Sequence, residues 1–193
     1  MRTANNFTLD KKNFLRYELG LLTMKSALST RDSAWPIYCK SKKAHQRTPV
    51  QNTIRKTLRD IEIYYSEQTV SEDQHIHLIC NTADMLSTEL KSFLFNGRFR
   101  IGISQKLVNL HLKYLWVADV ISEPPHCPLD GIVRDLAGIN YNWTRNDSIS
   151  EYKDAITSLR KIAAPRSLSA WELCEFRRPA QNLIKSSSPL DPN

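Results

Sequence analysis

Apolar residues recur three and four positions apart in separate segments, and this spacing constrains the fold more than any other feature. One turn of α-helix takes about 3.6 residues, so side chains at this spacing share one helical face. Few runs alternate β-branched and polar residues, which argues against a large sheet. The sequence therefore predicts an all-α protein with four amphipathic stripes: Phe14, Tyr17, Leu21, Met24 and Leu28; Val50, Ile54, Leu58, Ile61 and Tyr65; Ile76, Ile79, Ala83, Leu86, Leu90 and Phe93; Ile149, Tyr152, Ile156, Leu159 and Ala163.

Capping patterns predict where these helices begin and end. The first helix is expected over residues 9–28. Ser/Thr-x-x-Glu/Gln is typical of a capping box, in which the first and fourth residues bond each other's backbone. Asp130 is expected to cap a short helix that ends at Gly138, and Asn96-Gly97 to end the third helix. The four candidate boxes begin at Thr48, Ser71, Ser148 and Ser169.

A helix near residues 103–121 is predicted to lie in the middle of the protein. Its second half, residues 112–121, is apolar nearly all round, and such helices are buried in a bundle. We expect an irregular bundle of about five to six helices that forms a single domain over residues 1–184. Residues 185–193 are rich in Ser and Pro and are expected to form a disordered tail.

Neither a membrane segment nor a zinc site is expected. No apolar run approaches the roughly 20 residues that span a bilayer, and the N-terminus lacks the apolar stretch of a secretory signal. The four cysteines are spread evenly without a CxxC pair, so they are expected to be reduced thiols that bind no metal. No cofactor is indicated, and a cytoplasmic location is expected.

The positive charge is concentrated in the first third of the chain. The net charge is +7, yet residues 1–66 hold 13 Lys and Arg against 5 Asp and Glu, and residues 67–193 hold 14 against 15. A localised excess of this kind indicates an anionic partner.

A basic run with interleaved aromatic rings lies inside that third. Phosphate contacts combined with stacking rings are typical of nucleic-acid surfaces, and Trp35, Tyr38 and His45 lie within or beside the run. An ordinary solvated loop is the alternative. The residues expected to contact nucleic acid are Lys40, Lys42, Lys43 and Arg47 in this run, with Arg55, Lys56 and Arg59 on the polar face of the second helix.

A second group of polar residues surrounds the central helix. Lys106, Asn109 and Lys113 are three and four positions apart and share one face, with Gln105 beside it. Arg98 and Arg100 precede the helix, where backbone N–H groups favour anions. A phosphate site made by these two arginines with Gln105 and Lys106 is one interpretation, and a solvated stripe is the other.

The loop Pro124-Pro-His-Cys-Pro-Leu-Asp130 follows that helix, and its His126 and Asp130 complete the candidate pocket. A cysteine nucleophile needs a base within hydrogen-bond reach, and adjacent residues in an extended loop point in opposite directions. His126 is therefore poorly placed to activate Cys127. A rigid corner with a hydrogen-bonded His126 and a buried Cys127 is the favoured interpretation.

The segment Phe99-Arg-Ile-Gly-Ile-Ser-Gln-Lys-Leu-Val-Asn-Leu-His-Leu-Lys-Tyr-Leu-Trp116 and this loop carry a resemblance. They are similar to an uncharacterised family of bacterial helical proteins with an FRIGxxQKxxNLxLKYLW helix and a PPHCPxD loop. The similarity covers mainly residues 98–133 and extends weakly to Trp171-Glu-Leu173. It implies a helical architecture and a region of interest, with no known activity.

Three functions stay open at this point. Binding of nucleic acid through the N-terminal third comes first. A protein-interaction or accessory module comes second, because the sequence has no Gly-rich phosphate loop, HExxH or GxSxG motif. An enzyme with its site near residues 98–130 is the third possibility. His75 and His77 do not suggest a metal site, because residues two apart on a helix do not face each other.

Overall fold

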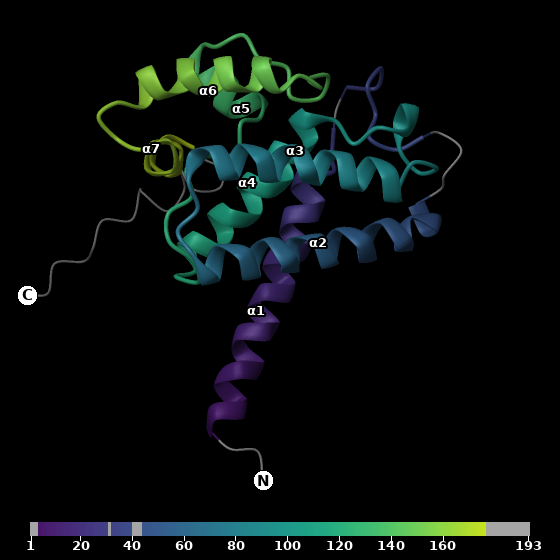
Figure 1. The fold of residues 1–193 in the computed structure, drawn as a ribbon, viewed down its shortest axis with the longest axis vertical. Helices are drawn as coiled ribbons and strands as arrows, with labels where there is room; N and C mark the ends of the chain where they lie inside the picture. Colours follow the sequence, from purple (N-terminus) through teal and green to yellow (C-terminus); the bar gives the residue numbers. More distant parts are fainter. Residues whose placement is uncertain (1–3, 31, 40–43, 177–193) are drawn as a thin grey trace, which may run out of the picture.

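A computed structural model describes residues 4–30, 32–39 and 44–176 of the chain, and Figure 1 shows its fold. Within these residues there are helices and no β-strand, so the all-α prediction is confirmed. The seven α-helices found there slightly exceed the five to six expected. They are α1 (Ala4–Ala27), α2 (Thr48–Glu67), α3 (Glu72–Glu89), α4 (Ile101–Val117), α5 (Gly131–Ala137), α6 (Ile149–Ala163) and α7 (Leu168–Glu175), with 3-10 turns at Ala44–Arg47 and Phe95–Gly97.

Helix α4 is the centre of the protein, as predicted. It contacts α1, α2, α3 and α6, and every residue from 101 to 109 is buried. Figure 1 shows α2 and α3 crossing in front of α4, with α5, α6 and α7 grouped at the top of the view. Buried apolar residues from helices α1 to α7 form one hydrophobic cluster around it.

The central helix ends earlier than the expected Ile121. Asp119 adopts a left-handed φ of 55°, the Asp119 N–H donates to the Trp116 carbonyl and the Val120 N–H donates to the Leu115 carbonyl. This is the Schellman arrangement that closes helices, usually with glycine at the left-handed position. Because aspartate takes that position here, the apolar pattern gave no signal of the end.

Only the C-terminal part of the stripe predicted on the first helix packs against the core. Met24 is buried, and Leu21 and Leu28 pack partly against the core. Phe14 and Tyr17 are 68% and 52% exposed, so that part of the prediction is wrong. Figure 1 gives the reason, because the N-terminal half of α1 extends beyond the other helices and has few neighbours to cover it.

Two of the four predicted caps begin their helices, and Ser71 forms the complete capping box with Gln74. Ser148 accepts from the Glu151 backbone, but the Glu151 carboxylate accepts from Asn146 instead of closing the box.

The other two predicted caps are wrong. The 3-10 turn before Thr48 continues into α2, so Thr48 lies inside the helix and Arg47 precedes it without a side-chain cap. Ser167 caps α7 in place of Ser169, because the Ser169 hydroxyl is buried and donates to the Pro124 carbonyl. The cap of α5 by Asp130 and its left-handed end at Gly138 are confirmed.

A loop before α6 lies directly on the start of α4. The Gly102 N–H donates to the Asn146 carbonyl at 3.0 Å. A Cβ added at Gly102 would lie 2.0 Å from the Trp143 carbonyl oxygen, so this contact requires glycine. The contact places Trp143 beside the polar face of α4.

Candidate functional site

Gln105 on α4 holds the loop that follows the helix. Its Nε2 donates to the Leu129 carbonyl at 2.7 Å and to the Gly102 carbonyl at 3.0 Å, and its Oε1 accepts from the Leu129 N–H at 3.2 Å. The side-chain amide thus bonds both backbone groups of one loop residue. An amide suits this role because it carries a donor and an acceptor in one plane.

Asn109, one turn further along α4, continues this contact into the core. Its Nδ2 lies 3.0 Å from the Cys127 carbonyl, 3.1 Å from the Tyr152 hydroxyl and 3.2 Å from the Gln105 Oε1. The Tyr152 hydroxyl also lies 2.8 Å from His126 Nδ1. The two amides therefore fix residues 126–129 against α4 and α6.

Two histidines meet behind this loop. The His126 and His75 rings are edge to face with centroids 4.7 Å apart, and both residues are fully buried. His126 Nε2 lies 3.2 Å from a Glu72 carboxylate oxygen, and His75 Nδ1 lies 2.5 Å from the Tyr65 hydroxyl. Burial lowers the pKa of His75 to about 3 and that of His126 to about 4, so both rings are neutral near pH 7.

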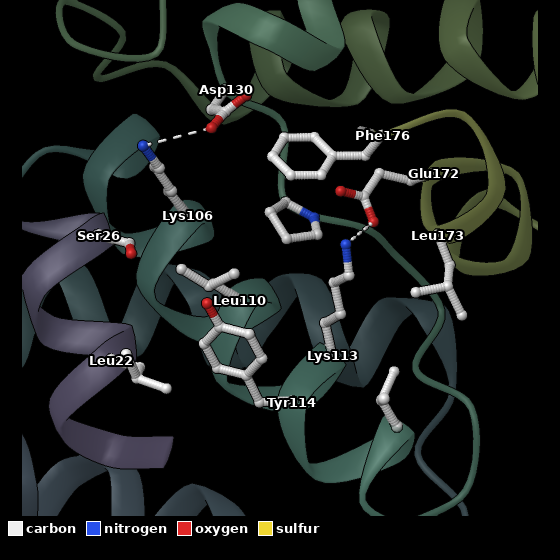
Figure 2. Close-up of a pocket in the computed structure, with 12 residues that line it drawn as sticks. Leu22, Ser26, Lys106, Leu110, Lys113, Tyr114, Asp130, Glu172, Leu173 and Phe176 are labelled. Carbon is white, nitrogen blue, oxygen red and sulfur yellow. Dashed lines mark ion pairs between the residues drawn. The ribbon is translucent and has the colours of Figure 1, made fainter. Parts of the chain in front are cut away.

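A pocket of about 400 Å³ opens on the outer side of α4, and Figure 2 shows it. Lys106 Nζ lies 3.4 Å from an Asp130 oxygen and 4.0 Å from the centre of the Trp143 ring. Lys113 Nζ lies 2.5 Å from a Glu172 oxygen. Leu22 and Ser26 of α1 form the facing wall, so the pocket has one lysine–carboxylate pair at each end and apolar side chains between them.

Burial shifts the ionisation of both pairs. It lowers the pKa of the Lys106 ammonium, which Asp130 partly offsets. It raises the pKa of the Glu172 carboxyl, which Lys113 partly offsets. Charged groups taken out of water in this way are stable only when paired, which explains why each lysine has a carboxylate.

The structure brings six of the eight predicted pocket residues together. Lys106, Lys113 and Asp130 line the pocket, and Gln105, Asn109 and His126 form the hydrogen-bond network behind it. Lys106, Asn109 and Gln105 are buried and Lys113 is half-buried, so these residues do not form the solvated stripe that was the alternative.

Arg98 and Arg100 do not join them. Arg98 pairs with Asp84 and Asp147, and the buried Arg100 donates to the carbonyls of Trp35, Pro36 and Thr144. The Ile101 N–H at the start of α4 donates to Asp147. The anion expected at this helix terminus is thus the protein's own carboxylate, and the four residues of the interpreted phosphate site are not assembled.

Cys127 is buried, and burial raises the pKa of its thiol. Its backbone carbonyl, rather than its sulfur, takes part in the network through Asn109. The buried Cys127 and the hydrogen-bonded His126 agree with the interpretation of this loop as a rigid corner. Among the described residues no group of three or more His, Cys, Asp and Glu is arranged to hold a metal ion.

Sequence reasoning did not identify His75, Tyr152, Glu172 and Trp143 as parts of this region. Two of them had a signal. His75 lies one position before Ile76 on the buried side of α3, and Tyr152 was already part of an apolar stripe, where a phenol needs a hydrogen-bond partner. Trp143 reaches α4 only through the tertiary fold, so no local pattern marks it. Glu172 was expected to close the capping box of Ser169, and the structure pairs it with Lys113 instead.

A separate basic cleft of about 400 Å³ lies between α1 and α2. Arg16, Arg55 and Arg59 line it together with Tyr17. Arg16 Nε lies 2.5 Å from Glu62, and the Arg55 guanidinium lies 5.5 Å from the centre of the Tyr17 ring. Of the three helix residues predicted to contact nucleic acid, Arg55 and Arg59 line this cleft, and Lys56 is exposed but does not line it.

The basic run is described only in part, because Lys40, Lys42 and Lys43 lie outside the described residues. Arg47 lies over the Tyr38 ring, with 4.2 Å between the guanidinium carbon and the ring centre. Trp35 packs against Phe95 and Arg100. These two half-buried rings thus contact other parts of the protein, whereas Phe14 and Tyr17 of α1 are exposed, and of these two Tyr17 lines the cleft.

Comparison with protein-family models, curated proteins and solved structures gives no match to this chain. In the part of the chain that the structure describes, the helices are too short or too polar for any of them to traverse a lipid bilayer.

Proposed function

We propose that this protein binds single-stranded nucleic acid in the cleft between α1 and α2. The observation that carries the proposal is the gathering of three arginines and an exposed tyrosine ring around one cleft. Among the described residues that line it, the one acidic side chain is Glu62, which is already paired with Arg16. Arg55 and Arg59 would contact phosphates.

Tyr17 favours a single strand over a duplex. Tyr17 is 52% exposed and lines the cleft, so an unpaired base can stack on its ring. The Arg55 guanidinium already lies over this ring, so a base stacked nearby would also gain a cation–π contact.

The test is fluorescence anisotropy with labelled oligonucleotides of about 12 nucleotides, as single-stranded DNA, single-stranded RNA and duplex DNA. Replacing both arginines (Arg55→Glu with Arg59→Glu) should remove most of the binding. Replacing them by Gln should make the slope of log affinity against log salt shallower by about 1.4, at roughly 0.7 for each lost phosphate contact with a single strand.

A matched control is available on α6, where Lys153 and Lys161 are exposed. The variant with Lys153→Glu and Lys161→Glu has the same change in net charge and should bind as the unaltered chain does. Equal loss in both double variants, or binding that ignores salt, would mean that the cleft is not the site. Tyr17→Ala should weaken single-stranded binding about tenfold, or about 1.4 kcal/mol, which lies within the usual stacking free energy of about 1–3 kcal/mol per base.

A further inference from the structure

The pocket on the other side of α1 has features of a second, independent binding site. Leu22 and Ser26 face it, whereas Asn13, Tyr17 and Gly20 face the basic cleft. Its two lysines are seven residues apart on α4, and a helix rises about 1.5 Å per residue, so the two charged ends lie about 10 Å apart.

The charges of this pocket are balanced, unlike those of the cleft. Lys106 is backed by Asp130 and Lys113 by Glu172. A ligand with several negative charges would meet two carboxylates, and one with several positive charges would meet two ammonium groups. A dipolar ligand with one charge of each sign leaves no buried charge without a partner.

The two ends of the pocket differ in what they offer. The Lys106–Asp130 distance of 3.4 Å is longer than the 2.7–2.9 Å typical of a tight charge-assisted bond, and the Ser26 hydroxyl lies at the same end. This end can accept an added anionic group. At the other end one Glu172 oxygen bonds Lys113, and Figure 2 shows the second oxygen directed toward the pocket, where it can accept from an ammonium group.

The middle of the pocket is apolar and is lined by Leu22, Leu110, Pro128 and the rings of Tyr114 and Phe176. We propose that the pocket binds a short apolar peptide of about three residues with both ends free, its carboxylate at Lys106 and its ammonium at Glu172. An extended chain spans about 3.3–3.6 Å per residue, so about three residues reach from one pair to the other. The volume of about 400 Å³ lies within the range of small-ligand sites.

The direct test is isothermal titration calorimetry of the full chain with the tripeptide Ala-Leu-Ala. Its N-acetylated form, its C-terminal amide and the form with both caps are titrated in parallel. Each single cap should weaken binding at least tenfold. Equal affinity for capped and free peptides, no saturation at millimolar peptide, or equally strong binding of free leucine would overturn the proposal.

Two variants assign the ends. Lys106→Met should remove the effect of the C-terminal amide, since the group that senses the carboxylate is gone, and should leave the effect of the acetyl group. Glu172→Gln should do the reverse. Lys161→Met on α6 is the matched surface control and should change neither. If each cap weakens binding to a variant as much as it weakens binding to the unaltered chain, the assignment of the two ends fails. The peptide series on the unaltered chain tests the proposal even if one variant does not fold.

This inference does not depend on the proposed function. Peptide binding should survive the substitutions at Arg55 and Arg59, and oligonucleotide binding should survive Lys106→Met. Either proposal can therefore fail while the other stands.

Discussion

The two sides of α1 hold basic side chains in opposite electrostatic settings. On the pocket side, Lys113 keeps 13% of its side chain exposed and pairs with a Glu172 that keeps 3%. On the cleft side Arg16 is paired too, with the buried Glu62, but Arg59 and Lys56, which is close to it in sequence, are exposed and have no ion pair within the described residues. A cation of the first kind is part of the folded structure, because its loss strands a buried charge. A cation of the second kind is available to a partner, because its loss costs the fold little.

Acid should have the largest effect on stability, because three buried histidines are neutral: His75 and His126 in the network behind the pocket, and His111, which lines the cleft. The pKa of His75 is lowered to about 3, and those of His111 and His126 to about 4, all by burial. In the unfolded chain each has a pKa of about 6.5. Between pH 6.5 and 4 the unfolded state therefore binds more protons, so the free energy of unfolding falls as the pH falls.

At pH 5 each buried histidine should cost about 2 kcal/mol relative to pH 7, or roughly 6 kcal/mol for the three together. Urea unfolding at pH 7, 6 and 5 measures this. The exposed His77 is the control, since His77→Gln should keep the full pH dependence, while His111→Gln should remove about a third of it. A free energy of unfolding that is constant over this range would contradict the neutral, buried state of these rings.

The lysine–carboxylate pairs give the second prediction. Lys113→Met should destabilise the fold by about 3–5 kcal/mol, the usual cost of removing one member of a buried pair. Arg59→Met on the cleft side should change stability by less than about 0.5 kcal/mol, as is typical of exposed positions.

Chemical unfolding of the two variants gives both changes in the free energy of unfolding. The difference between them measures how much more the fold depends on Lys113 than on Arg59. Because the pKa of the Glu172 carboxyl is already raised, it should take up a proton in Lys113→Met. The destabilisation should therefore shrink at low pH. Similar losses in the two variants at pH 7 would show that the pocket-side charges are no more structural than the others.

Backbone packing on the pocket side gives the third prediction. Gly102→Ala places a methyl group 2.0 Å from the Trp143 carbonyl oxygen, so the loop before α6 must move away from α4. We expect a loss of about 3 kcal/mol, which is the upper end of the usual cost of overpacking. For a chain of this size the Tm should fall by about 6–12 °C. Differential scanning calorimetry measures it, and an unchanged Tm would mean that the loop is not held at this glycine.

How much of the fold the sequence predicts also differs from one region of the molecule to another. On α2, α3 and α6 the apolar stripes predict the buried faces, because these helices are covered along their length. On α1 the pattern continues past the point where its neighbours end. Phe14 and Tyr17 have the right spacing for burial, but periodicity does not encode how long the partner helices are.

The candidate site divides in the same way. The common face of Lys106, Asn109 and Lys113 follows from helical geometry, and the structure has it. The choice of partners does not follow, because Glu172 and Asp147 reach the ends of α4 only through long-range contacts. Arg98 and Arg100 illustrate the consequence, since local electrostatics predicted an anion near them and the fold supplied Asp147.

Gly20 offers the smallest and most selective change on the cleft side. It lies inside α1 and faces the cleft, and an added Cβ would meet nothing within 4 Å. Gly20→Ala should therefore stabilise the chain by about 0.5–1 kcal/mol, because alanine loses less conformational entropy in a helix. The Tm should rise by about 1–4 °C. Calorimetry should therefore show opposite changes in Tm for the same glycine-to-alanine substitution, a rise at Gly20 and a fall at Gly102.

The effect of Gly20→Ala on oligonucleotide affinity tests the proposed site more directly than its effect on Tm. If phosphates contact Arg55 and Arg59, as proposed, one methyl group added at Gly20 should change oligonucleotide affinity by less than about fivefold, since a methylene-sized contact is worth about 0.8 kcal/mol even when it is fully buried. A rise in Tm combined with a larger loss of affinity would place the ligand against α1 at Gly20. A fall in Tm would show that the space above Gly20 is filled, and the cleft would then not be open to a strand at all.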